Sequence, residues 1–174
     1  FIQVNIGNEL QKSGINVKGN APIFNGDFTN KSFGFGGGFQ YSHYLSPKLD
    51  IGLKGDYFYF RGGQDFYKEY MSGNVTLGYT FLPLDKLTPY IYAGAGGIFD
   101  IRSPDPNLTE DSSGINLQYG LALKYNINPK VSFFISAENN HTTSDTIDDI
   151  VNGKRDDFYY NFSIGMEFRI GKKL

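Results

Sequence analysis

Apolar and polar residues alternate with a period of two along most of this chain. In residues 115–127, isoleucine, leucine and tyrosine occupy the odd positions, and asparagine, glutamine, glycine, alanine and lysine occupy the even ones. Successive side chains of a strand point to opposite faces, so this pattern predicts a strand with one apolar face. The same alternation predicts eight strands, at residues 2–7, 33–45, 49–59, 71–81, 90–102, 115–127, 131–139 and 158–170.

The connections between the predicted strands alternate in length. Short segments that contain proline predict tight turns, at 46–48, 83–86 and 128–130, with a further short connection at 62–65. Long polar segments predict loops, at 8–31, 103–113 and 140–156. The three tight turns therefore lie at one end of an antiparallel sheet, and the long loops and the connection at 62–65 lie at the other. Eight such strands can close, so the predicted fold class is all-β: a single eight-stranded up-and-down barrel spanning residues 1–174.

Side-chain size indicates which face of this barrel points outward. The apolar register is crowded with phenylalanine, tyrosine, leucine and isoleucine, which are too bulky for the interior of an eight-stranded barrel. The polar register is rich in glycine, serine, asparagine and threonine, which fit there. We therefore predict a transmembrane β-barrel, with a soluble lipocalin-like carrier as the alternative. In 90–102 the assignment stays open, because Tyr90, Tyr92 and Ile98 are apolar enough to reverse the two faces.

Composition excludes several classes of function. The chain has 16 Lys+Arg against 18 Asp+Glu, a net charge of -2, which argues against a basic surface for nucleic acid. It has no cysteine, and His43 and His141 are its only histidines, so we expect no metal site and no cofactor.

Charged residues also occur in the register that faces the lumen. Three cations and three anions lie there, and an unpaired buried charge costs several kcal/mol, so we predict that they pair and help to fill the lumen. A gated conduction path is the alternative. The predicted lumen charge network consists of Lys54, Asp56, Lys124, Glu138, Glu167 and Arg169.

The last predicted strand carries Ser163, Gly165, Phe168 and Ile170, in the order polar, glycine, aromatic, apolar. With the strand pattern of the whole chain, these residues resemble the small eight-stranded outer-membrane barrels of Gram-negative bacteria, the group that contains OmpX, OmpW and the OmpA transmembrane domain. In that family the motif is the insertion signal that the barrel-assembly machinery reads. The resemblance implies an outer-membrane location with periplasmic termini, contact with the bilayer and lipopolysaccharide, and a non-enzymatic structural or surface-interaction role, with an envelope protein as a further candidate partner.

Two alternatives to that role come from the family and from the lumen. One is a narrow channel for small solutes. The other is a lipid A-modifying enzyme, because the lipid A deacylases use a His-x-Ser dyad with an acid, and His141 and Thr143 are similarly spaced here, with Asp145 or Asp156 as the acid. Threonine replaces the expected serine, so we predict no catalysis.

Several lysines lie in the predicted tight turns or near the last predicted strand's end, on the same side of the barrel. They are candidates for contact with acidic lipid head groups or with a periplasmic partner. The residues are Lys48, Lys86, Lys130, Lys172 and Lys173.

Overall fold

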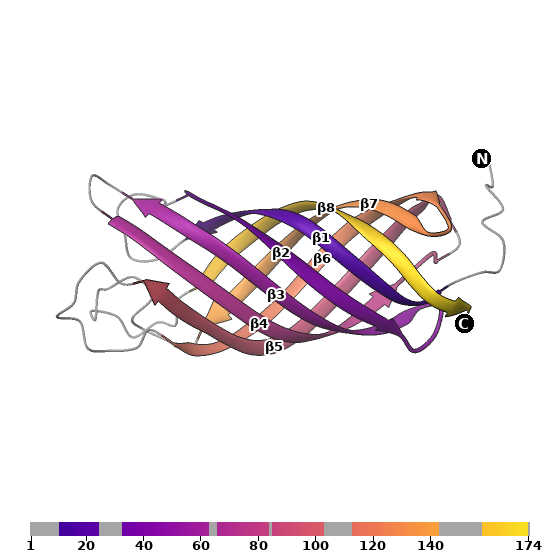
Figure 1. The fold of residues 1–174 in the computed structure, drawn as a ribbon, viewed down its shortest axis with the longest axis horizontal. Coiled ribbons are helices and arrows are strands. Elements are labelled where there is room, and N and C mark those ends of the chain that lie inside the picture. Colours follow the sequence, from indigo (N-terminus) through magenta and orange to yellow (C-terminus); the bar gives the residue numbers. More distant parts are fainter. Residues whose placement is uncertain are drawn as a thin grey trace.

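The computed structural model is a closed, all-antiparallel barrel of eight strands in which each strand pairs with its neighbour in the chain and β1 pairs with β8 (Figure 1). It describes residues 11–24, 33–62, 66–83, 85–102, 113–142 and 158–173. The strands are β1 (Gln11–Phe24), β2 (Phe33–Tyr44), β3 (Leu49–Gly62), β4 (Phe66–Thr80), β5 (Leu87–Arg102), β6 (Gly114–Asn128), β7 (Val131–Thr142) and β8 (Phe158–Lys173). Within these ranges no helix is long and apolar enough to cross a membrane.

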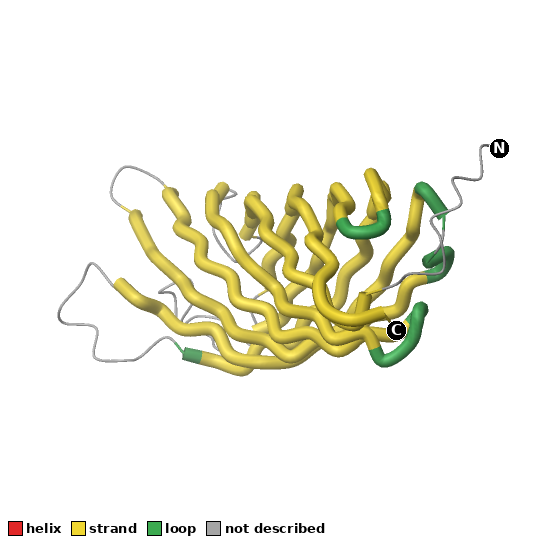
Figure 2. Tube along the Cα trace, turned by 45° about the vertical axis from the view of Figure 1, so that its right-hand side comes forward, coloured by secondary structure: helices red, strands yellow, loops and turns green. Residues whose placement is uncertain are grey.

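The predicted fold class is confirmed, and so are seven of the eight predicted strands. The tight turns that join β2 to β3, β4 to β5 and β6 to β7 lie at the same end of the barrel as the C-terminal end of β8 (Figure 2). Strands of 12 to 16 residues are longer than the roughly 9 to 11 tilted residues that cross a bilayer. The strands therefore extend beyond the thickness of a hydrocarbon core.

The prediction for the first strand was wrong. The strand that closes the barrel is β1, which falls within the segment predicted to be a loop, and residues 2–7 lie outside the described residues. Its outward positions include Ile15 and Val17 but also Gly19 and Ala21, so the apolar half of the alternation is weak. Pairing with two neighbouring strands, rather than its own apolar content, makes this segment a strand.

The predicted orientation of the two registers agrees with the structure. Most of the large apolar side chains of the strands point out of the barrel, and most of the polar ones are buried inside it. In β5 the outward residues include Ile91, whereas Tyr90 is buried and Tyr92 points inward with it. Both tyrosines face the lumen because their hydroxyl groups bond to carboxylates there, Tyr90 to Asp50 and Tyr92 to Glu138.

Strands β4 and β5 approach each other closely at Gly96. A Cβ atom added to Gly96 would lie 1.9 Å from the carbonyl oxygen of Gly73. The backbone of one of the two strands would have to move to relieve this clash. We expect Gly96→Ala to lower the free energy of unfolding by about 1 to 3 kcal/mol, measured by urea titration in vesicles with circular dichroism. Gly73→Ala is the control, because a Cβ there meets nothing within 4 Å, and its effect should stay within about 0.5 kcal/mol. Equal losses in both variants would show that this contact is not tight.

Candidate functional site

The lumen contains a central ion cluster made of Lys18, Lys54, Asp56 and Glu138. Lys54 forms ion pairs with Glu138 and, at 3.2 Å, with Asp56, whose other oxygen lies 2.8 Å from the Lys18 ammonium. These residues come from β1, β3 and β7, so the cluster connects three separate parts of the wall. Each is almost completely shielded from solvent, and the pairing offsets the large cost of burying charge.

Neutral side chains complete the coordination of the central ion cluster. Tyr92 donates to Glu138 at 2.7 Å, and Asn140 donates to the other oxygen of that carboxylate at 3.0 Å. Asn20 donates to Asp56 at 2.8 Å, and the Lys54 ammonium donates to Gln118 at 2.9 Å. The carboxylates and Lys54 thus have several partners each, which holds the cluster in one arrangement.

A second set, the turn-side ion cluster, consists of Lys124, Glu167 and Arg169. Glu167 accepts from Lys124 at 2.5 Å, from Nε of Arg169 at 2.8 Å and from the Tyr44 hydroxyl at 2.8 Å. Nη2 of Arg169 also donates to Asn126 at 2.7 Å and to Ser132. Its Nη1 donates to the carbonyl of Pro129, so this cluster lies next to the tight turns.

The six predicted network residues are thus brought together as two groups of three. Among the described residues, the ion pairs of the two groups share no member. Sequence reasoning missed Lys18, because β1 was read as a loop. The signal was present, since Asn16, Lys18 and Asn20 are polar at alternate positions and all face the lumen.

Apolar side chains fill the lumen toward the long connections, and we refer to them as the aromatic cap. The aromatic cap consists of Phe58, Tyr70, Ile98 and Tyr159, each exposed by 1% or less. The ring of Phe58 lies 5.5 Å from that of Tyr159 and 6.1 Å from that of Tyr70. Sequence reasoning did not predict it, because these residues occupy the register that is otherwise polar.

The space between the two ion clusters is small. A cavity of about 30 Å³ lies there, lined in part by Lys18, Lys54 and Lys124 together with Tyr90 and Phe134. That volume holds about one water molecule. The aromatic cap and the two ion clusters thus fill much of the lumen that the described residues enclose.

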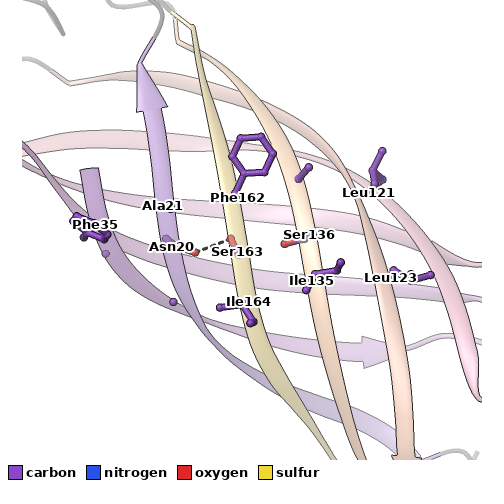
Figure 3. A pocket seen from close by; sticks show the side chains of 13 residues that line it. Asn20, Ala21, Phe35, Leu121, Leu123, Ile135, Ser136, Phe162, Ser163 and Ile164 are labelled. Atoms are coloured by element: carbon purple, nitrogen blue, oxygen red, sulfur yellow. Dashed lines mark hydrogen bonds between the residues drawn. The ribbon is translucent and has the colours of Figure 1, made fainter. Parts of the chain in front are cut away.

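The outer wall carries a shallow apolar groove of about 790 Å³ over β7, β8 and β1 (Figure 3). Small outward residues, among them Gly19, Ala21 and Ala137, form its floor between larger ones such as Phe35 and Phe162. Its lining contains no charged side chain. The groove offers shape and apolar contact, and it brings together no groups for acid–base or nucleophilic chemistry.

Several solved structures have a similar fold. Neisserial surface protein A matches with a TM-score of 0.71 and 12% identity, covering 91% of this chain and 97% of that one. The attachment invasion locus protein Ail of Yersinia pestis matches with a TM-score of 0.56 and 17% identity, covering 92% and 99%. The chain has the fold of the small outer-membrane β-barrels.

The outer membrane enzyme PagL has the same fold, with a TM-score of 0.55 and 20% identity over 89% of this chain and 99% of that one. No family model and no curated protein matches the sequence. An attachment invasion locus protein and an enzyme thus share one architecture at these low identities, so the fold does not determine the function.

The candidate catalytic histidine lies on the outer wall. His141 is exposed near the end of β7, and its ring lies 6.0 Å from that of Tyr119 and 6.1 Å from that of Phe158. Its proposed partners Thr143, Asp145 and Asp156 lie outside the described residues. Within the described part of the chain, no group of three or more histidine, cysteine, aspartate or glutamate side chains is arranged to hold a metal ion.

The predicted insertion signal is divided between the two faces of β8. Ser163 and Gly165 face the lumen, where Ser163 donates to Asn20 at 2.8 Å. Phe168 and Ile170 point outward and are exposed. β8 also forms the closing seam with β1, so the same residues that would be read during assembly complete the barrel.

Proposed function

We propose that this chain is an integral outer-membrane barrel that conducts no solutes and acts as a non-enzymatic structural or surface-interaction protein. One observation supports this proposal above all: the outward register carries a large, exposed apolar side chain on every strand. One from each strand is exposed by 50 to 61%: Val17, Phe39, Leu53, Val75, Phe99, Leu121, Ile135 and Ile164.

An apolar surface of this extent requires a nonpolar solvent. Soluble monomers rarely expose contiguous apolar patches larger than a few hundred Å², whereas this surface encircles the barrel. Closure of the sheet also pairs the backbone groups internally, as hydrocarbon demands. Exposed aromatic residues near both ends, such as Tyr41, Tyr125 and Tyr160, suit the two interfaces of a bilayer.

The fold shared with bacterial outer-membrane barrels supports that membrane as the location. We place the tight turns and the chain termini in the periplasm, with the long connections toward lipopolysaccharide. The barrel-assembly machinery reads Ser163, Gly165, Phe168 and Ile170, and an envelope protein remains a candidate partner. The packed lumen supports a structural role over transport.

Electrophoresis and conductance together test the proposal. Material purified in detergent should migrate differently when boiled and unboiled, because a compact barrel resists unfolding until it is heated. The same unboiled material, inserted in a planar bilayer, should produce no discrete conductance steps, because the ion clusters and the aromatic cap fill the lumen. Stable unit steps from verified, folded protein would contradict a non-conducting role.

A separate assay addresses the enzyme alternative. Lipid A from cells that express the chain should have the same mass as lipid A from cells that do not. Loss of an acyl chain on expression, abolished by His141→Ala, would replace the structural role with a catalytic one.

A further inference from the structure

Three lysines occupy equivalent positions in three successive hairpins. They lie in the turns β2–β3, β4–β5 and β6–β7, and the carbonyl of each accepts a hydrogen bond from the next strand around the barrel. The donors are Thr80 N to Lys48 at 2.7 Å, Asn126 N to Lys86 at 2.8 Å and Arg169 N to Lys130 at 2.7 Å. The fold therefore repeats one lysine position around the barrel's end.

Side chains hold these turns in place. Ser46 Oγ accepts from the backbone N–H of Lys48 at 3.3 Å, and Asn128 Oδ1 accepts from that of Lys130 at 2.8 Å. In the remaining turn, Thr88 Oγ1 lies 3.1 Å from the carbonyl of Asp85, to which it donates. Because the backbone is already ordered, a ligand that binds a lysine here orders only that side chain.

Two more lysines lie at the same end, so that charge is concentrated there. Lys12 is near the start of β1 and Lys172 near the end of β8, and both are exposed, as are the three turn lysines. Within the described residues, none of these five forms an ion pair with a carboxylate. Asp85 is the exposed carboxylate among the described turn residues at this end. The end is strongly cationic.

The lysines adjoin an aromatic girdle. Exposed aromatic side chains approach the turn end on several strands, among them Tyr79, Phe81 and Tyr125. The Lys86 ammonium lies 5.2 Å from the centre of the Tyr125 ring. Tyrosine and phenylalanine in such girdles sit at the level of lipid head groups, so a lysine beside them reaches the phosphates.

We propose that Lys12, Lys48, Lys86, Lys130 and Lys172, the turn-end lysine ring, bind the phosphate groups of anionic glycerophospholipids in the adjacent leaflet. This inference rests on the proposed membrane location. The three turn lysines lie in one hairpin after another, and Lys12 and Lys172 lie on the two strands of the closing seam, so the charges follow the perimeter where head groups surround an embedded barrel. That distribution matches many small anions better than it matches one acidic protein face.

The test uses vesicles and native mass spectrometry. The chain is reconstituted in phosphatidylcholine alone or mixed with phosphatidylglycerol, and the lipids retained on the folded barrel are counted. We expect retention of phosphatidylglycerol over phosphatidylcholine, weakening with salt. Lys48→Gln/Lys86→Gln/Lys130→Gln should reduce that preference on the order of 100-fold, roughly fivefold per lysine.

The matched control keeps the charge. Lys48→Arg/Lys86→Arg/Lys130→Arg should retain the preference for phosphatidylglycerol, and heat-dependent mobility should be normal for both triple variants, since these side chains lie outside the lumen. An unchanged preference in the glutamine variant, or its loss in the arginine variant, would overturn the lysine ring. Failure of the wild-type chain to enter either kind of vesicle would instead overturn the proposed membrane location.

Discussion

Leu121→Arg is expected to lower the free energy of unfolding in phospholipid vesicles by about 2 to 4 kcal/mol. Leu121 lies in the middle of β6, points outward and is 61% exposed, so the arginine would enter the centre of the hydrocarbon. Urea titration followed by circular dichroism measures the change, since the chain contains no tryptophan.

Ile127→Arg is the matched control on the same strand and face. Ile127 is similarly exposed but lies beside the tight turn at the end of β6, where an arginine reaches the interface. Its cost should be about 0 to 1 kcal/mol. A Leu121→Arg variant as stable as Ile127→Arg would mean that this wall does not face lipid.

Glu167→Gln is expected to cost about 3 to 5 kcal/mol of unfolding free energy. Glu167 is fully buried and pairs with both Lys124 and Arg169, so a neutral amide removes the carboxylate that forms ion pairs with these two buried cations. The substitution preserves shape, so the loss reports charge rather than packing.

Asp85→Asn provides the control for the same acid-to-amide exchange. Asp85 is exposed in the β4–β5 turn, and its substitution should change stability by no more than about 0.5 kcal/mol. If Glu167→Gln proves as mild as Asp85→Asn, the turn-side ion cluster does not contribute to stability as its geometry indicates.

The residues that face outward can be predicted from sequence, because the alternation of apolar and polar residues within a strand is a local pattern. In β6, alternation over residues 115–127 is sufficient to assign both faces. The direction of those faces follows from volume, since the bulky apolar side chains on most strands exceed the space in an eight-stranded lumen. Periodicity fails for β1, where glycine and alanine occupy outward positions and partners on both sides supply the order.

The contacts inside the lumen depend on how distant strands are aligned, and the alternation within one strand carries no information about that alignment. Lys54 on β3 meets Glu138 on β7 across the lumen, a pairing that depends on how the strands are staggered. Sequence could predict that charges pair but not that they separate into two clusters. The aromatic cap was not predicted because Phe58 and Tyr159 occupy the register that is otherwise polar, and they come together only when the barrel closes.

The most direct test of lipid exposure exploits the absence of cysteine from the chain. Single cysteines introduced along β6 between Leu117 and Leu123, each spin-labelled in vesicles, report access to oxygen, which concentrates in the bilayer, and to a water-soluble nickel complex. We expect oxygen access to alternate, high at Leu117, Leu121 and Leu123 and low at Gln118 and Ala122. High nickel access at the leucine positions, with oxygen access at Gln118 and Ala122, would contradict an outward, lipid-facing apolar register.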